Sequence, residues 1–185
     1  RTRERVLGAR GTPVLTEFGI ALTGVSETNE GFHFNRLRPC DTQLLAAASG
    51  WGEVMLGGRW EKMEPGLAYL TPPGVPHAYR ARRGGKWKVA WVIYRGRGPR
   101  QPGFPLPEAP AVIPVPSRQL WHAIEGACDA AAPGDPAPTI RQWAQLIHQT
   151  VLQALEAHEQ PPRLAALWSA VSADLSRPWT LDDLA

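Results

Sequence analysis

One short stretch constrains the fold more than the rest of the chain: residues 66–79, Gly-Leu-Ala-Tyr-Leu-Thr-Pro-Pro-Gly-Val-Pro-His-Ala-Tyr. Its Pro-Pro-Gly run at residues 72–74 predicts a tight turn, because proline fixes φ and glycine permits a positive φ. The residues before this turn leave room for only a short strand, and a second strand follows it. His77 and Tyr79 are two residues apart, so their side chains point to the same side of that second strand.

The part of the chain up to Tyr94 carries other short strands and turns. Residues 42–48 are apolar on both faces, as expected of a buried strand. The Gly-Gly pair at residues 57–58 predicts a hairpin. A final strand presents four apolar side chains on one face: Trp87, Val89, Trp91 and Ile93. Many short strands with regular turns predict a β-barrel or a β-sandwich.

The pattern changes after residues 99–116, a stretch that contains seven prolines. It should be extended, and should link two parts of the chain or lie over the barrel. Beyond it the apolar residues recur with helical spacing. Ser117 is a suitable N-cap for a helix that ends near Ala131, and Thr139 for a second helix that stops before residue 161. The predicted fold class is α+β, a barrel followed by helices that pack on it.

Composition and charge set limits on the function. The net charge of +3 is too small to indicate a nucleic-acid surface by itself. Cys40 and Cys128 match no metal or redox spacing, which favours free thiols in a reducing compartment and so a cytoplasmic protein. No apolar run approaches the roughly 18 residues of a membrane span, so we expect no membrane partner.

Two parts of the sequence together resemble the AraC-type transcription regulators. Residues 72–79 and the strand at 87–94 resemble the cupin-like effector-binding barrel of that family. Residues 164–185, which end in Pro-Trp-Thr-Leu-Asp-Asp-Leu-Ala, resemble the opening of its DNA-binding domain. Thr180 could cap a further helix, and the sequence stops one turn into it, at Ala185, so we expect the chain to be part of a longer protein.

The resemblance implies four regions. They are a cupin-like effector-binding barrel, a proline-rich linker, dimerisation helices and the incomplete start of a helix-turn-helix domain, at residues 1–98, 99–116, 117–160 and 161–185. It implies a small-molecule effector and a homodimer as partners. DNA would be bound only through the C-terminal domain that this sequence lacks, and RNA polymerase is a further partner to consider for the full-length regulator. We expect no cofactor and no catalytic residue.

The second predicted helix carries an apolar stripe with i, i+3, i+4, i+7 spacing. It consists of Ile140, Trp143, Ala144, Ile147, Val151 and Leu155. The resemblance implies that Trp143, Ile147, Val151 and Leu155 dimerise with a second copy across a two-fold axis. The alternative is that the stripe only covers the barrel.

His77 is the obvious candidate metal ligand. Metal-binding cupins supply His-x-His and a glutamate from an earlier motif, but the corresponding residues 46–63 contain no histidine. One histidine with scattered carboxylates is a poor transition-metal site, so we expect no metal. His77 should instead contact the effector or hydrogen-bond to the backbone near the turn.

Arg36 shares strand parity with Phe32 and Phe34, so it faces the interior if they do. A buried guanidinium needs a carboxylate or a polar ligand. By resemblance to a sugar-binding member of the family, Arg36 contacts the ligand and Trp91 stacks on the sugar. Tyr79 and Thr23 match ligand contacts in the same way. The alternatives are a surface salt bridge for Arg36 and core packing for Trp91, whose role Trp87 could also take.

The preferred hypothesis is that the chain is the effector-sensing and dimerising part of a regulator. It would bind a sugar or sugar acid without catalysing a reaction. A metal-dependent cupin enzyme, an isomerase or a dioxygenase, is the alternative. A structural module whose barrel is packed solid is the third hypothesis.

Overall fold

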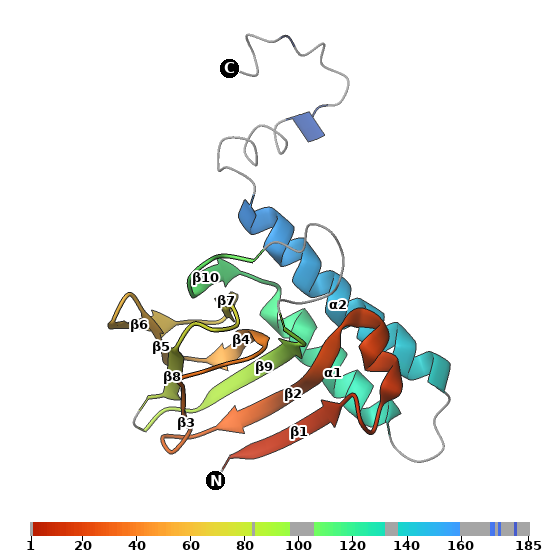
Figure 1. Ribbon diagram of the computed structural model, residues 1–185, viewed down its shortest axis with the longest axis horizontal. Helices are drawn as coiled ribbons and strands as arrows, with labels where there is room; N and C mark the ends of the chain where they lie inside the picture. Colours follow the sequence, from red (N-terminus) through yellow and green to blue (C-terminus); the bar gives the residue numbers. More distant parts are fainter. Residues whose placement is uncertain are drawn as a thin grey trace.

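The structure is a computed structural model that describes residues 2–82, 84–96, 106–131 and 137–159, together with residues 171, 172, 174 and 180. Within these residues the chain forms two antiparallel β-sheets and two α-helices (Figure 1). We expected a barrel; the strands form two separately hydrogen-bonded sheets that face each other. Most of residues 161–185, and so most of the expected start of the DNA-binding domain, lie outside the described residues.

The larger sheet has six strands in the order β1-β2-β9-β4-β7-β10. Its strands are β1 (Arg3–Gly8), β2 (Ile20–Thr28), β9 (Trp87–Tyr94), β4 (Thr42–Gly50), β7 (Leu67–Thr71) and β10 (Ala111–Pro114). Strand β9 pairs with β2 on one side and with β4 on the other. Both faces of this sheet are covered, which explains why β4 is buried along almost its whole length, as its sequence predicts.

The smaller sheet has four strands in the order β3-β8-β5-β6. Its strands are β3 (His33–Arg36), β8 (His77–Ala81), β5 (Gly52–Leu56) and β6 (Arg59–Met63). The predicted Gly-Gly hairpin joins β5 to β6, and both glycines have positive φ, 53° and 81°. This backbone conformation favours glycine and matches the twist of a two-residue hairpin.

The molecule has three layers, with one apolar cluster on each face of the larger sheet. One cluster lies between the two sheets and includes Trp87, Val89 and Trp91 of β9. The other lies between the larger sheet and the helices α1 (Ser117–Ala130) and α2 (Ala137–Glu159). A short 3-10 helix, η1 (Pro13–Phe18), packs against α2. Figure 1 shows both helices on the side of the larger sheet away from β3, β5, β6 and β8.

Both edge strands of the larger sheet lie where the sequence did not predict a strand. Strand β1 precedes the first expected strand and pairs with β2. Strand β10 lies inside the proline-rich stretch that we expected to be a linker, and it pairs with β7 from residue 111 to residue 114. An edge strand needs only one hydrogen-bonded side, which is why a segment near several prolines can serve.

The beginnings of the two helices also differ from the prediction. Helix α1 starts at Ser117 itself, with no side-chain cap. The Ser117 hydroxyl instead accepts a hydrogen bond from the backbone N–H of Gly66, at 2.9 Å, and so ties the helix to the turn before β7. Helix α2 starts two residues before Thr139, at Ala137.

The apolar stripe of α2 is buried within the protomer, where this helix packs against α1, η1 and β10 of the larger sheet. Ile147 and Val151 have no exposed surface and Leu155 is 1% exposed in the single chain. All three belong to the cluster beneath the helices, with the half-buried Trp143 packed against it. These three side chains therefore leave almost no exposed surface for contact with a second copy, and the prediction that they form a dimer interface has no support from the single chain.

Candidate functional site

A cavity of about 210 Å³ opens between the two sheets. Strands β1, β2, β4 and β9 of the larger sheet supply one wall, and β3, β8 and the residue before β3 supply the other. The residues that line it are Glu4, Val6, Leu22, Phe32, Phe34, Arg36, Gln43, Tyr79, Trp91 and Ile93. Three of the five predicted ligand contacts, Arg36, Tyr79 and Trp91, thus come together from three different strands.

Strand pairing explains how β3 and β8 build their wall. Phe34 lies directly opposite Tyr79, and Arg36 lies directly opposite His77. Directly opposed residues project their side chains from the same face of a sheet. The rings of Phe34 and Tyr79 stack, with centroids 5.3 Å apart and planes 27° apart. Phe32, Phe34 and Arg36 line one cavity, as their shared parity predicts.

Trp91 is held in the opposite wall by a chain of hydrogen bonds. Its indole Nε1–H donates to Ser26 Oγ at 3.0 Å, and the Ser26 hydroxyl donates to Glu4 Oε1 at 2.6 Å. The Thr23 hydroxyl donates to the backbone oxygen of Trp91 at 2.8 Å. Gly24 lies directly opposite Trp91 on β2, and a Cβ there would come within 2.6 Å of the indole ring. The ring therefore needs a glycine at this position to lie as close to β2 as it does.

The polar groups of the cavity differ in how well they are satisfied. Gln43 Nε2–H donates to the Tyr79 hydroxyl at 3.1 Å, so both groups have a partner within the protein. Glu4 accepts the Ser26 hydrogen bond described above. The Nε atom of Arg36 is buried and has no hydrogen-bond partner among the described residues. A buried polar atom without a partner is uncommon and marks a position that a ligand can satisfy.

Thr23 and His77, the other two predicted ligand contacts, do not line this cavity. Thr23 is fully buried and holds the backbone of β9. His77 is 3% exposed, and its Nδ1–H donates to the backbone oxygen of Val75 at 3.1 Å, the backbone contact that the sequence offered as its alternative role. Their roles as direct ligand contacts stay predictions without support from the cavity lining.

The reasoning from sequence missed two polar residues of the cavity, Glu4 and Gln43. Glu4 enters through β1, which the sequence did not predict. Gln43 directly precedes the five apolar residues 44–48 of β4, and a long polar side chain beside such a buried run is the one signal in the sequence for it.

Two buried histidines make the stability of the fold depend on pH. Burial lowers the pKa of His77, and the nearby charge of Arg36 lowers it further against the opposing hydrogen bond to Val75. Burial also lowers the pKa of His148, whose Nδ1 lies 3.2 Å from the Tyr94 hydroxyl. A histidine in the unfolded chain takes up a proton near pH 6.5. At that pH both of these side chains are still neutral in the folded chain.

This predicts that the free energy of unfolding is largest above about pH 6.5 and falls as the pH drops below it, because the unfolded chain then binds more protons. Urea unfolding at pH 7.5 and pH 5.5 measures the difference. His148→Gln should reduce it, whereas His158→Gln, at an exposed position, should leave it as it is. A chain equally stable at both pH values would contradict the prediction.

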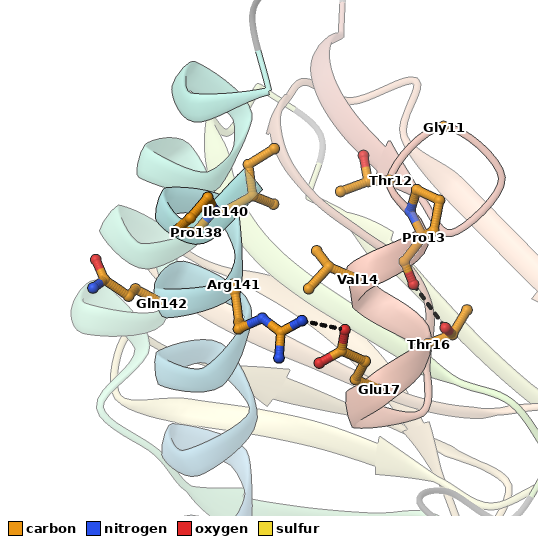
Figure 2. A pocket seen from close by; sticks show the side chains of 10 residues that line it. All are labelled: Gly11, Thr12, Pro13, Val14, Thr16, Glu17, Pro138, Ile140, Arg141 and Gln142. Atoms are coloured by element: carbon orange, nitrogen blue, oxygen red, sulfur yellow. Dashed lines mark hydrogen bonds and ion pairs between the residues drawn. The ribbon is translucent and has the colours of Figure 1, made fainter. Parts of the chain in front are cut away.

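A second hollow, larger and more open, lies between η1 and the first turns of α2 (Figure 2). Its volume is about 760 Å³, and Val14 and Ile140 lie on its two sides. Its charged groups already pair with each other, since Arg141 Nη2–H donates to Glu17 Oε1 at 2.7 Å. Size favours this groove as a binding site, but the unpartnered guanidinium atom lies between the sheets, and we therefore take the smaller cavity as the candidate site.

Neither a metal cluster nor a membrane-spanning helix is found in the part of the chain that the structure describes. No three histidine, cysteine, aspartate or glutamate side chains there come together in a way that would hold a metal ion. None of the helices described there is both long and apolar enough to cross a bilayer.

The two facing sheets, with a small cavity between them and helices on one outer face, define a ligand-binding domain. The sequence of residues 19–177 matches the family model of the AraC-like ligand binding domain. The chain therefore belongs to this family, as its sequence motifs predict. A search of curated proteins gives no match.

Several solved structures are partly similar. The cupin domain of an XRE family transcriptional regulator from Enterobacter cloacae is 16% identical, with a TM-score of 0.42 over 52% of this chain and 98% of that one. A putative glyoxylate-induced protein from Pseudomonas aeruginosa is 21% identical, with a TM-score of 0.44 over 61% of this chain and 40% of that one. A predicted oxalate decarboxylase from Thermotoga maritima is 13% identical, with a TM-score of 0.42 over 51% of this chain and 80% of that one.

Proposed function

We propose that this chain is the effector-sensing part of an AraC-type transcription regulator and that it binds a small polar molecule between its two sheets. The observation that carries the proposal is the convergence of Arg36, Tyr79 and Trp91 on one cavity, in a chain that belongs to a ligand-binding family. Aromatic walls supply contact area, and a few polar groups fix the orientation of the ligand. The sugar or sugar acid implied by the resemblance is the starting point for a search.

The bound effector would act on the C-terminal DNA-binding domain of a cytoplasmic regulator by favouring one arrangement of the domains. It can shift that equilibrium only by as much as it binds one arrangement more tightly than the other. Strand β1 is a route for such coupling. Glu4 and Val6 line the cavity, while Leu7 packs in the cluster beneath the helices and Arg5 Nη2–H donates to Asp129 Oδ1 of α1 at 2.5 Å.

Dimerisation remains part of this proposal, but through other residues of α2. The outward face of this helix carries Leu146, which is 45% exposed, among the exposed Gln142, Gln149 and Gln153. These positions follow i, i+4, i+7 and i+11 spacing and so form one stripe. Sedimentation of the chain and of Leu146→Glu tests the proposal: a dimer that the substitution dissociates would support it, and a monomer at all concentrations would contradict it.

A thermal-shift screen of sugars, sugar acids and other small acids, followed by calorimetric titration of each compound found, tests effector binding. We expect Trp91→Ala to weaken the affinity about tenfold or more, because an aromatic wall of the cavity is lost. Unchanged affinity in this variant would show that the cavity between the sheets is not the binding site. The metal-dependent enzyme is tested separately by elemental analysis, where a stoichiometric transition metal would support it.

A further inference from the structure

The guanidinium of Arg36 has a buried part that no acidic side chain pairs with in the described parts of the chain. Its Nε is buried without a partner, and none of the ion pairs among the described residues involves Arg36. Its Cζ lies 5.7 Å from the centre of the Phe34 ring, against an aromatic wall. Removing a charge from water is costly unless an opposite charge or strong hydrogen bonds replace the water.

Two other charged or titratable groups lie near Arg36, and neither forms an ion pair with it among the described residues. Glu4 also lines the cavity, but it is exposed on the edge strand and accepts the hydrogen bond of Ser26. His77 lies opposite Arg36 on β8, and both burial and the Arg36 charge lower its pKa, so it stays neutral. The end of the cavity at Arg36 therefore has a positive charge to offer to a ligand.

The hydroxyl of Tyr79 adds a hydrogen-bond donor to the cavity. Because this oxygen accepts the N–H of Gln43, its own proton is left to donate to a ligand. Arg36 and Tyr79 thus both offer donors to the same space, the pattern that a carboxylate, which only accepts, satisfies best.

Apart from Glu4 and Gln43, the remaining walls are apolar, and half of their side chains are aromatic. Phe32, Phe34 and Trp91 contribute rings, and Leu22 and Ile93 contribute aliphatic side chains. A sugar ring carries a hydroxyl on nearly every carbon, and each hydroxyl that faces such a wall would lose its hydrogen bonds to water without replacement. A flat apolar ring loses nothing there and can stack on the aromatic side chains.

The size of the cavity limits the ligand further. Its volume of about 210 Å³ is below the roughly 300–1,000 Å³ of pockets for drug-sized ligands. A single ring with an acidic group is of this scale, whereas a disaccharide or a long acyl chain is not.

We propose that the effector is a small aromatic carboxylate whose carboxylate group is bound by Arg36 and whose ring lies between the Phe34–Tyr79 wall and Trp91. This inference rests on the proposed effector site and specifies the chemical class of its ligand.

Calorimetric titration of the chain with benzoate and salicylate, their neutral amides, galacturonate and galactose tests the proposal. We expect an aromatic carboxylate to bind, and its amide to bind at least tenfold more weakly. Arg36→Gln should weaken carboxylate binding about 10- to 100-fold, the range for a charge-assisted hydrogen bond. Arg36→Lys keeps the charge but not the planar fork, so its affinity for the carboxylate should lie between that of the unsubstituted chain and that of Arg36→Gln.

Arg38→Gln is the matched control, because it removes one positive charge two residues away at an exposed position that does not line the cavity. It should leave the affinity unchanged, and a thermal melt of each variant confirms that it is folded. Tighter binding of galactose or galacturonate, or benzoate binding that Arg36→Gln does not weaken, would contradict the proposal that the ligand is an aromatic carboxylate. Neither result would contradict the proposed effector site. No binding by any compound of the panel and of the wider screen would count against both.

Discussion

Trp87→Ala should destabilise the fold by about 3–5 kcal/mol, the range for removing a large aromatic side chain from a packed core. Trp87 has no exposed surface, and its ring meets Phe32 edge-on at 6.2 Å. Its ring also lies against the backbone of β5, since a Cβ at Gly52 would come within 2.4 Å of it. The surrounding strands cannot close over the space that alanine leaves. Urea unfolding of the variant measures the loss.

Trp60→Ala is the control for this prediction. Trp60 is half-buried on β6, where the guanidinium of Arg80 lies 3.9 Å above its ring, so its removal should cost about 1 kcal/mol or less. Equal losses in the two variants would show that Trp87 does not have the structural role assigned to it. The sequence left Trp87 and Trp91 as competitors for the ligand contact. The structure distinguishes the two tryptophans, because Trp91 lines the cavity and Trp87 does not.

Gly24→Ala should disturb both the fold and the site. A Cβ at this position would lie 2.6 Å from the Trp91 ring and 2.6 Å from the backbone oxygen of Arg5 on β1. The backbone of β1 can yield only if its pairing with β2 is disturbed, so the indole must move toward the cavity. We expect a loss of about 1–3 kcal/mol in stability, the usual cost of overpacking, and a ligand affinity reduced at least tenfold.

Chemical unfolding and titration of the same Gly24→Ala preparation separate the two effects. Gly11→Ala is the matched control, because the nearest heavy atom to a Cβ there is 3.9 Å away. It should change stability by less than about 0.5 kcal/mol and affinity not at all. If Gly24→Ala bound ligand as tightly as the unsubstituted chain, the indole would not be the wall of the binding site.

Local sequence patterns predicted the inner strands well. The Gly-Gly hairpin and the apolar faces of β4 and β9 follow from turn chemistry and from two-residue periodicity, which depend on neighbours in the sequence. The edge strands β1 and β10 could not be predicted in this way. Strand β1 is largely exposed and lacks alternation, and β10 ends at Pro114, so only pairing with distant strands defines them.

The candidate site was predictable to the extent that strand parity determines it. Parity placed Arg36 on the same side as Phe32 and Phe34, and all three line the cavity. Glu4 and Gln43 join them through pairing between strands far apart in the sequence, which parity within one strand cannot show.

The apolar stripe of α2 illustrates a different limit. Helical periodicity shows that one face of a helix is covered but not what covers it. Ile147, Val151 and Leu155 would give the same pattern whether a second copy or the larger sheet lay against them. Burial within the single chain shows that elements of the same chain, α1 and η1 together with the larger sheet, cover this stripe.

A crystal structure of this chain with the tightest-binding compound of the panel would show directly where the ligand lies. We predict density for the compound between the two sheets, within hydrogen-bonding distance of Arg36 and against the ring of Trp91. Density for the compound in the groove between η1 and α2, with only solvent beside Arg36, would contradict the proposed binding site between the sheets.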